Sequence, residues 1–175
     1  TEIDDVRQQG VEIAENLLLS DRAQVILPWH RLLDAARESA AGAGKIGTTL
    51  RGIGPAYECA AARKGIRVAD LMRPEVLAVR VRALAAEMGP LLRALGAAEV
   101  PEVDAVLEHL LKSGERIRPH VRDTGRYLRD HLARGRTLLA EGAHGAMLDI
   151  SAGTYPFVTS STCTSAGVAA GLHIS

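Results

Sequence analysis

Two segments rich in glycine and hydroxyl side chains carry the residues that could do chemistry. The first runs from Lys45 to Glu58, and the second runs from Glu141 to Ser161. Glycine lets a backbone approach a ligand closely and adopt positive φ, while hydroxyls and consecutive N–H groups donate hydrogen bonds. Both segments are therefore typical of a site that binds a small anion, such as a phosphate group.

In the first segment, the hydroxyls of Thr48 and Thr49 are candidate phosphate donors, and Arg51 or Arg63 would supply positive charge. The segment lacks the Gly-Lys-Ser/Thr ending of a Walker A loop, so it is not a nucleoside-triphosphate loop of that kind. The alternative is that its glycines serve only a tight turn between a helix and the next element. Composition leaves both interpretations open.

In the second segment, Glu141, His144 and Asp149 bring titratable groups to the end of an expected buried strand. Open α/β sheets bind ligands at such strand ends, although a lone histidine there is more often structural than catalytic. A dense run of hydroxyls from Thr159 to Ser165 follows and includes Ser160. It either caps the next helix or donates to an anion at the start of that helix, and spacing does not decide between the two.

Charge and cysteine content exclude several classes of protein. The 175 residues include 21 basic and 21 acidic side chains, so no global positive field attracts nucleic acid or an anionic membrane. Cys59 and Cys163 lack metal-ligand spacing and are interpreted as reduced thiols of a cytoplasmic protein; no metal site is expected. No apolar run reaches the ~18 residues of a membrane span. A basic stripe is interpreted as a solvated face paired with acidic neighbours: Arg118, Arg122, Arg126 and Arg129.

The order of elements predicts an α/β fold, in which a partial sheet is interrupted by a mostly helical subdomain. We expect residues 1–28 to end an α/β core, residues 29–135 to form the helical subdomain with the first glycine-rich loop, and residues 136–175 to return to the core. Strands are expected at Leu17–Ser20 and Thr137–Ala140, in one sheet. The missing initial Met and the glycine-rich end predict an interior piece of a longer chain.

The helical part shows clear periodicity. One helix is expected to begin at Trp29, and another to run from Pro74 with a kink or split at Gly89-Pro90. A shorter helix should follow Pro101 and end at Ser113-Gly114. A last one should end at Gly135. The apolar stripe of the long helix is Leu77, Val81, Leu84, Met88, Leu91 and Leu95, and that of the last helix is Ile117, Val121, Leu128 and Leu132.

At the two glycine-rich segments the chain resembles the adenylosuccinate synthetase family. The matching stretches are Ile46-Gly47-Thr48-Thr49-x-Arg51-Gly52-Ile53-Gly54-Pro55-Ala56-Tyr57-Glu58, Glu141-Gly142-Ala143-x-Gly145-x-x-Leu148-Asp149-Ile150 and Gly153-Thr154-Tyr155-Pro156-Phe157-Val158-Thr159-Ser160-Ser161. The resemblance implies an interior fragment of a larger P-loop-containing ligase fold. It further implies a cytoplasmic enzyme of purine biosynthesis that uses GTP and Mg²⁺ to join IMP and aspartate into adenylosuccinate.

The resemblance also implies roles for single residues. Thr49 and Thr159 would bind IMP through its 5′-phosphate, and Arg63 would cross a homodimer interface to the IMP phosphate of the partner. His144 stands where the family has a glutamine that contacts the nucleotide. Thr48, Arg51 and Ser160 would support the loops. No catalytic residue or metal ligand is assigned, because the family's phosphate loop with its catalytic Asp and its catalytic His have no counterpart in this sequence.

Three departures from the family pattern keep other functions open. Leu50 replaces a glycine, Ala60 replaces a lysine, and His144 replaces the glutamine. These changes also fit a non-catalytic, purine-nucleotide-binding paralogue. A third interpretation is a helical oligomerisation module, because the stripe from Leu77 to Leu95 is heptad-like, although such a stripe is more often internal core.

Overall fold

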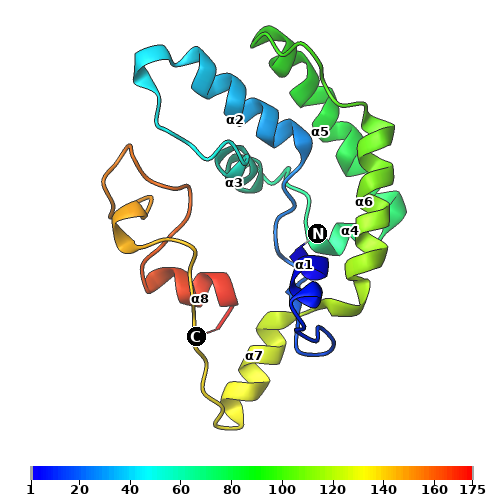
Figure 1. Ribbon diagram of the computed structural model, residues 1–175, viewed down its shortest axis with the longest axis vertical. Coiled ribbons are helices and arrows are strands. Elements are labelled where there is room, and N and C mark those ends of the chain that lie inside the picture. Colours follow the sequence, from blue (N-terminus) through cyan, green and yellow to red (C-terminus); the bar gives the residue numbers. More distant parts are fainter. Residues whose placement is uncertain (1, 175) are drawn as a thin grey trace.

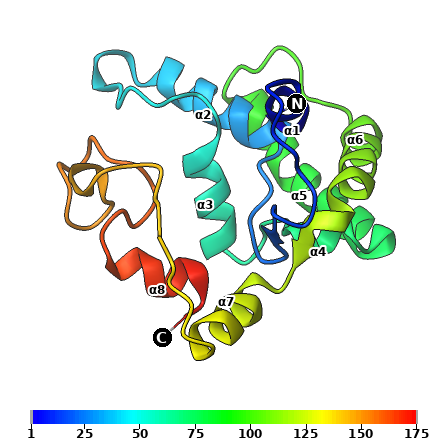
Figure 2. The ribbon, with the colours of Figure 1, turned by 60° about the horizontal axis from the view of Figure 1, so that its bottom comes forward.

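The computed structural model describes residues 2–174, which form a mostly helical fold with one small sheet. Figures 1 and 2 show α2 to α6 gathered into one group, with the C-terminal segment and α8 facing α3 from the other side. The elements are α1 (Glu2–Gln8), β1 (Leu19–Ser20), α2 (Pro28–Ala40), α3 (Ile53–Ala61), α4 (Val68–Leu71), α5 (Pro74–Ala94), α6 (Val103–Ile117), β2 (Val121–Arg122), α7 (Thr124–Ala133) and α8 (Ala166–Leu172), with short 3-10 turns at Gly42–Gly44, Arg118–His120 and Ala146–Leu148.

Helix α2 begins as the sequence predicts. Pro28 occupies its first turn, where a missing N–H costs nothing. Trp29 is fully buried, and its Nε1 donates to the carbonyl of Pro101 at 3.2 Å. His30 is also buried, and its Nδ1 accepts the backbone N–H of Leu27 at 3.1 Å. These contacts fix the start of α2 against the aliphatic core.

Helix α5 supplies one long wall of the core, and its expected stripe is confirmed over the first four positions. The helix runs unbroken through Gly89-Pro90, so it is not split there. After this point the stripe moves by one residue: Leu92 is fully buried, whereas Leu91 and Leu95 are 39% and 36% exposed. The buried members before it are Leu77, Val81, Leu84 and Met88.

The single helix expected between Ile117 and Gly135 is wrong. Helix α6 continues past the expected stop at Ser113-Gly114 to Ile117, and a 3-10 turn and β2 follow. Helix α7 starts only at Thr124, where the Asp123 carboxylate accepts the backbone N–H of Arg126 at 3.0 Å. The basic stripe is therefore not one helical face. Two of its members still pair as expected, in the ion pairs Arg118–Glu115 and Arg126–Asp130.

The predicted sheet has a different second strand. β1 pairs in parallel with β2, with Leu19 opposite Val121 and Ser20 opposite Arg122. Thr137–Ala140 has no strand geometry, and Leu139 is 95% exposed. A strand needs a neighbour for its backbone groups, and no other part of residues 2–174 lies beside this stretch as a strand. The domain boundaries at residues 28 and 135 stay predictions.

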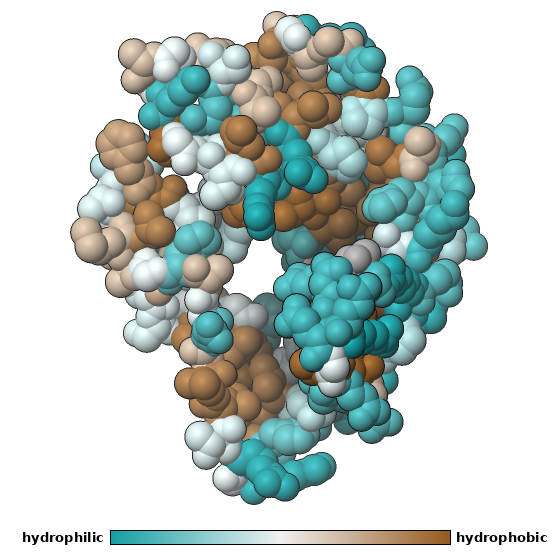
Figure 3. Space-filling view, in the orientation of Figure 1, coloured by the Kyte–Doolittle hydropathy of each residue, from teal (hydrophilic) through white to brown (hydrophobic). Residues whose placement is uncertain are grey.

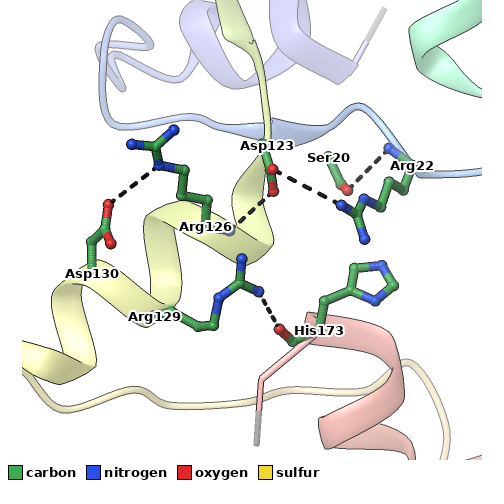
Figure 4. Close-up of polar contacts among 7 residues, drawn as sticks. All are labelled: Ser20, Arg22, Asp123, Arg126, Arg129, Asp130 and His173. Atoms are coloured by element: carbon green, nitrogen blue, oxygen red, sulfur yellow. Dashed lines mark hydrogen bonds and ion pairs between the residues drawn. The ribbon is translucent and has the colours of Figure 1, made fainter.

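Polar contacts join the sheet to α7 and α8 (Figure 4). Arg22 lies 3.9 Å from the carboxylate of Asp123. From α7, the guanidinium of Arg129 donates to the carbonyl of His173, just after α8, at 2.7 Å. Figure 3 shows an opening between the C-terminal segment and the helical group, and a cluster of apolar side chains beneath that segment. Within residues 2–174, no helix combines the length and apolarity needed to cross a membrane.

Candidate functional site

A cavity of about 570 Å³ lies where the two glycine-rich segments meet. Its walls come from α2, the first loop, the start of α3, and the second segment, which faces them in Figure 2. The lining residues are Asp34, Arg37, Glu38, Ile46, Gly47, Thr48, Thr49, Ile53, Gly54, Pro55, His144, Leu148, Phe157, Val158, Thr159 and Ser160.

The structure brings most of the sequence candidates together at this cavity. Thr48 and Thr49 line it from the first segment, and His144, Thr159 and Ser160 line it from the second. The two segments lie close together: a Cβ added to Gly54 would lie 3.3 Å from Oγ of Ser160. Arg51 and Arg63 are absent from its walls. The cavity thus gathers hydroxyl donors from both segments but neither candidate cation.

Two carboxylates of α2 hold the first loop at its ends, and the sequence analysis missed both. The Glu38 carboxylate accepts the backbone N–H of Ile46 at one oxygen and that of Gly47 at the other, both at 3.1 Å. The Asp34 carboxylate accepts the N–H of Gly52 at 2.9 Å. Their spacing of four residues, which places two side chains on one helix face, was the available signal.

The backbone of the loop takes left-handed geometry at three positions: Gly47, Leu50 and Gly52. Gly52 has φ of 78°, and a Cβ there would lie 2.7 Å from the backbone N of Arg31. Only glycine fits both demands. Leu50 has φ of 56°, so the loop uses positive φ at the position where the resemblance leads us to expect a glycine. A non-glycine residue pays roughly 1–2 kcal/mol for that conformation.

Asp149 organises the second segment. It is 1% exposed, and one carboxylate oxygen accepts the N–H groups of Ser151 and Ala152 at 2.8 and 2.9 Å. The other oxygen accepts those of Cys163 and Thr164 at 2.6 and 3.3 Å. These backbone donors, Ala152 foremost, hold the pKa of the Asp149 carboxyl below its usual value. Asp149 therefore folds the segment and does not face a ligand.

Backbone hydrogen bonds then bring Thr159 and Ser160 to the cavity. The N–H of Thr159 donates to the carbonyl of Leu148 at 2.9 Å, and the N–H of Ile150 donates to the carbonyl of Ser161 at 3.2 Å. The two stretches run beside each other, so the hydroxyl pair is fixed by the same turn that buries Asp149. His144 lies upstream of this turn, at the cavity and exposed.

The charges in the cavity walls are already paired. Arg37 forms two hydrogen bonds to the carboxylate of Glu58, at 2.6 and 3.3 Å. Bonding to Arg37 lowers the pKa of Glu58, and the same bonds raise the pKa of Arg37. Asp34 and Glu38 are engaged by the first loop. Among the described residues, the cavity thus has no unpaired lysine or arginine in its walls.

Arg63 lies at a second cavity of about 390 Å³. It follows the C-terminal end of α3, whereas Gly54 and Pro55 at the start of that helix line the first cavity. Arg63 has φ of 63°, and its guanidinium makes no hydrogen bond or ion pair within residues 2–174. The second cavity is lined by Asp21, Arg22, Gln24, Ala60, Arg63, Gly65, Arg67, Ala69, Asp70, Arg73 and Arg80, which gives five arginines against two aspartates.

Comparisons with known proteins agree with this geometry. The family model described as adenylosuccinate synthetase matches residues 1–175. The chain belongs to the adenylosuccinate synthetase family. It is 47% identical to the adenylosuccinate synthetase of Desulfatibacillum aliphaticivorans over 171 residues, which cover 97% of this chain and 40% of that protein. It is also 47% identical to that of Paraburkholderia xenovorans over 174 residues, which cover 99% of this chain and 39% of that protein.

A solved structure shows the same fold. The fully ligated adenylosuccinate synthetase of Plasmodium falciparum matches with a TM-score of 0.88 and 31% identity, over 99% of this chain and 40% of that one. The chain is therefore a partial α/β fold of the adenylosuccinate synthetase family, and it spans about 40% of the length of these relatives. Between residues 2 and 174, no group of three or more His, Cys, Asp or Glu side chains is placed to hold a metal ion.

Proposed function

We propose that this chain supplies the IMP-phosphate contacts of an adenylosuccinate synthetase, the ligase that joins IMP and aspartate in purine biosynthesis. One observation carries the proposal: Thr48 and Thr49 from one segment and Thr159 and Ser160 from the other line a single cavity. Hydroxyl groups that converge from two loops donate to a phosphate from several directions. The membership of the family supports IMP as the nucleotide.

Titration calorimetry with IMP on the full-length protein tests this proposal. Replacing Thr49 and Thr159 together by alanine should weaken IMP binding by about 100-fold or more, because two hydrogen bonds to a charged group are lost. Thr137, exposed and outside the cavity, provides the matched control as Thr137→Ala. An unchanged affinity in the double variant would refute the assignment of Thr49 and Thr159.

We further propose that the positive charge opposite the phosphate comes from Arg63 of a second copy in a homodimer. The described walls of the first cavity hold no unpaired cation, and an IMP phosphate needs one. Arg63 is unpaired and lies about 13 Å away along α3, by the usual rise of a nine-residue helix. In a symmetric dimer each copy would lend its Arg63 to the other.

Mixing two inactive variants distinguishes this crossing from a contact within one chain. One variant carries Arg63→Ala, and the other carries Thr49→Ala with Thr159→Ala. In a mixed dimer, one site receives every wild-type residue, so random exchange of subunits should restore about a quarter of wild-type activity. If Arg63 acts within its own chain, the mixture stays as inactive as its components.

GTP and Mg²⁺ belong to the proposed activity of the whole protein. In the proposed reaction, GTP phosphorylates the 6-oxygen of IMP. The amine of aspartate then attacks the carbon that bears this oxygen, and the oxygen leaves as inorganic phosphate. The described residues do not fit a metal site, and the sequence lacks a Walker A ending. We therefore assign them no step with GTP or Mg²⁺. Their part is to hold IMP by its phosphate while the base reacts elsewhere.

A non-catalytic purine-nucleotide binder is the second candidate, favoured by His144 in the cavity wall and by the strained Leu50. A neutral imidazole offers one hydrogen-bond donor and one acceptor, and so can replace part of what a glutamine amide offers. A protonated imidazole loses the acceptor. The two functions differ in one assay. GTP-dependent formation of adenylosuccinate by the full-length protein establishes the ligase; IMP binding without product formation establishes the binder.

A further inference from the structure

We propose that Asp34 and Glu38 are positioning residues that hold both ends of the first loop and so present Thr48 and Thr49 to the nucleotide phosphate. This inference rests on the proposed function of the first cavity. Both residues line that cavity. Neither carries a direct role in phosphate binding, because a carboxylate repels an anion.

The contacts divide the loop into held ends and a free middle. Glu38 takes the N–H groups of Ile46 and Gly47, and Asp34 takes that of Gly52. The residues between them, 48–51, make no hydrogen bond to either carboxylate. Ile46 and Gly47 donate their N–H groups to Glu38, and Leu50 donates its N–H to the hydroxyl of Thr48 at 3.4 Å. The backbone N–H groups that remain for a phosphate are those of Thr48, Thr49 and Arg51, beside the threonine hydroxyls.

The geometry requires carboxylates and not other polar groups. Glu38 accepts from two adjacent residues, one at each oxygen, and an ionised carboxylate is the side chain with acceptors on both atoms. An amide would turn its NH₂ donors toward one of these N–H groups. Asp34 is only 7% exposed, and the N–H of Gly52 gives its buried carboxylate a hydrogen-bond partner.

The placement of two carboxylates on one face of α2 is unfavourable in itself. Residues four apart lie on one face of a helix, and two like charges at this spacing repel each other. Both charges also face the cavity that would receive an anion. The two hydrogen-bonded loop ends explain why such a pair is present there.

Steady-state kinetics of the full-length protein test the inference. Glu38→Gln should raise the KM for IMP about tenfold and leave kcat within about twofold, because the loop contacts the phosphate and not the reacting base. Glu38→Ala, which removes both acceptors, should raise KM further. Asp34→Asn should act in the same direction. Glu108→Gln, which alters an exposed pair with Lys112, is the control and should change neither constant.

Residue-resolved hydrogen–deuterium exchange supplies a readout that does not depend on IMP. Glu38→Gln should speed exchange of the Ile46 and Gly47 amides by about tenfold and leave Gly52 unchanged, while Asp34→Asn should do the reverse. Unchanged exchange at these amides overturns the positioning role. Failure of the wild-type protein to bind IMP overturns the proposed function instead, and the exchange pattern then still decides how the loop is held. A fall in kcat with KM constant would also contradict the inference.

Discussion

Gly54 and Ser160 touch across the first cavity, so that a methyl group on Gly54 would lie 3.3 Å from Oγ of Ser160. One residue stands in the first turn of α3, and the other stands in the hydroxyl run near the end of the chain. This contact fixes how closely the two glycine-rich segments approach each other. The width of the proposed phosphate site therefore depends on a position that has no side chain.

Gly54→Ala should weaken IMP binding several-fold, because the added methyl pushes Ser160 away from the cavity. Stability should change little, since alanine is the better helix former by about 0.5–1 kcal/mol and offsets the crowding. Calorimetry with IMP and urea unfolding would measure both. In a Ser160→Ala background the methyl meets no Oγ, so the same substitution should have a smaller effect on affinity. Equal effects in both backgrounds would contradict the contact.

Leu50→Gly should stabilise the protein by about 1 kcal/mol. Glycine accepts φ of 56° without strain, and this relief exceeds its greater loss of chain entropy. Urea unfolding would show a higher midpoint with an unchanged slope. Leu132→Gly is the matched control, because Leu132 has similar exposure but lies inside α7. This substitution should lower the free energy of unfolding by about 1 kcal/mol.

Arg63→Gly should move stability and binding in opposite directions. Relief of the left-handed backbone at φ of 63° should add about 1 kcal/mol to the free energy of unfolding. Loss of the guanidinium should weaken IMP binding about tenfold or more. Arg67 lines the same cavity with an ordinary φ of −103°, so Arg67→Gly should show no gain in stability. A stable variant with wild-type affinity would remove Arg63 from the proposed site.

Stability should fall as pH drops from about 6.5 to about 4 because of His30. Burial lowers the pKa of this histidine from 6.5 to about 4, against a smaller opposing effect of Glu58. The unfolded chain therefore binds a proton in this range while the folded chain does not, which costs on the order of 3 kcal/mol at the acid end. His30→Asn keeps an acceptor for the Leu27 N–H and should flatten the slope. His109→Asn, at an exposed site, should leave it unchanged.

Asp149→Asn should loosen the second segment more than any other single change there. An amide cannot accept from four backbone N–H groups, so the turn that presents Thr159 and Ser160 opens. IMP affinity should fall about tenfold while the core stays folded. Hydrogen exchange would be faster at Ser151, Ala152 and Cys163 and normal in α5. Because the pKa of Asp149 is depressed, the wild-type carboxylate stays ionised at neutral pH, and its contribution to stability is lost only as the pH falls below the usual range of an aspartate.

The helices that pack on the core were predictable because their periodicity is long and local. Helix α2 and the first part of α5 follow the apolar spacing. The shift from Leu91 to Leu92 was not predictable, because the packing partners of the last turns decide which side is covered. The helical spacing of Ile117 and Val121 concealed β2 between α6 and α7, since two residues are too few to show a period of two.

The expected strand at Thr137–Ala140 failed for a different reason. Its residue types favour a buried strand, but a strand forms only beside another one, and the described chain offers none at that place. The whole chain spans about 40% of the length of its relatives, so the residue types of Thr137–Ala140 favour a strand for which the described residues provide no neighbour. β1 pairs instead with β2 at Val121–Arg122.

At the candidate site, sequence reasoning found the hydroxyl groups but not what holds them. Thr48, Thr49, Thr159 and Ser160 stand in motifs rich in glycine, which made them visible. Asp34, Glu38 and Asp149 act through backbone N–H groups, and such contacts leave no mark in composition. The bidentate pair of Arg37 and Glu58 likewise joins two helices whose packing the sequence does not state.

Helix α3 has one cavity at its start and another at its end. Gly54 and Ala60 belong to the same helix of nine residues, so the two cavities share one structural element. In the proposed homodimer, the two ends of each α3 would therefore contribute to different active sites, and α3 would be the direct connection between them.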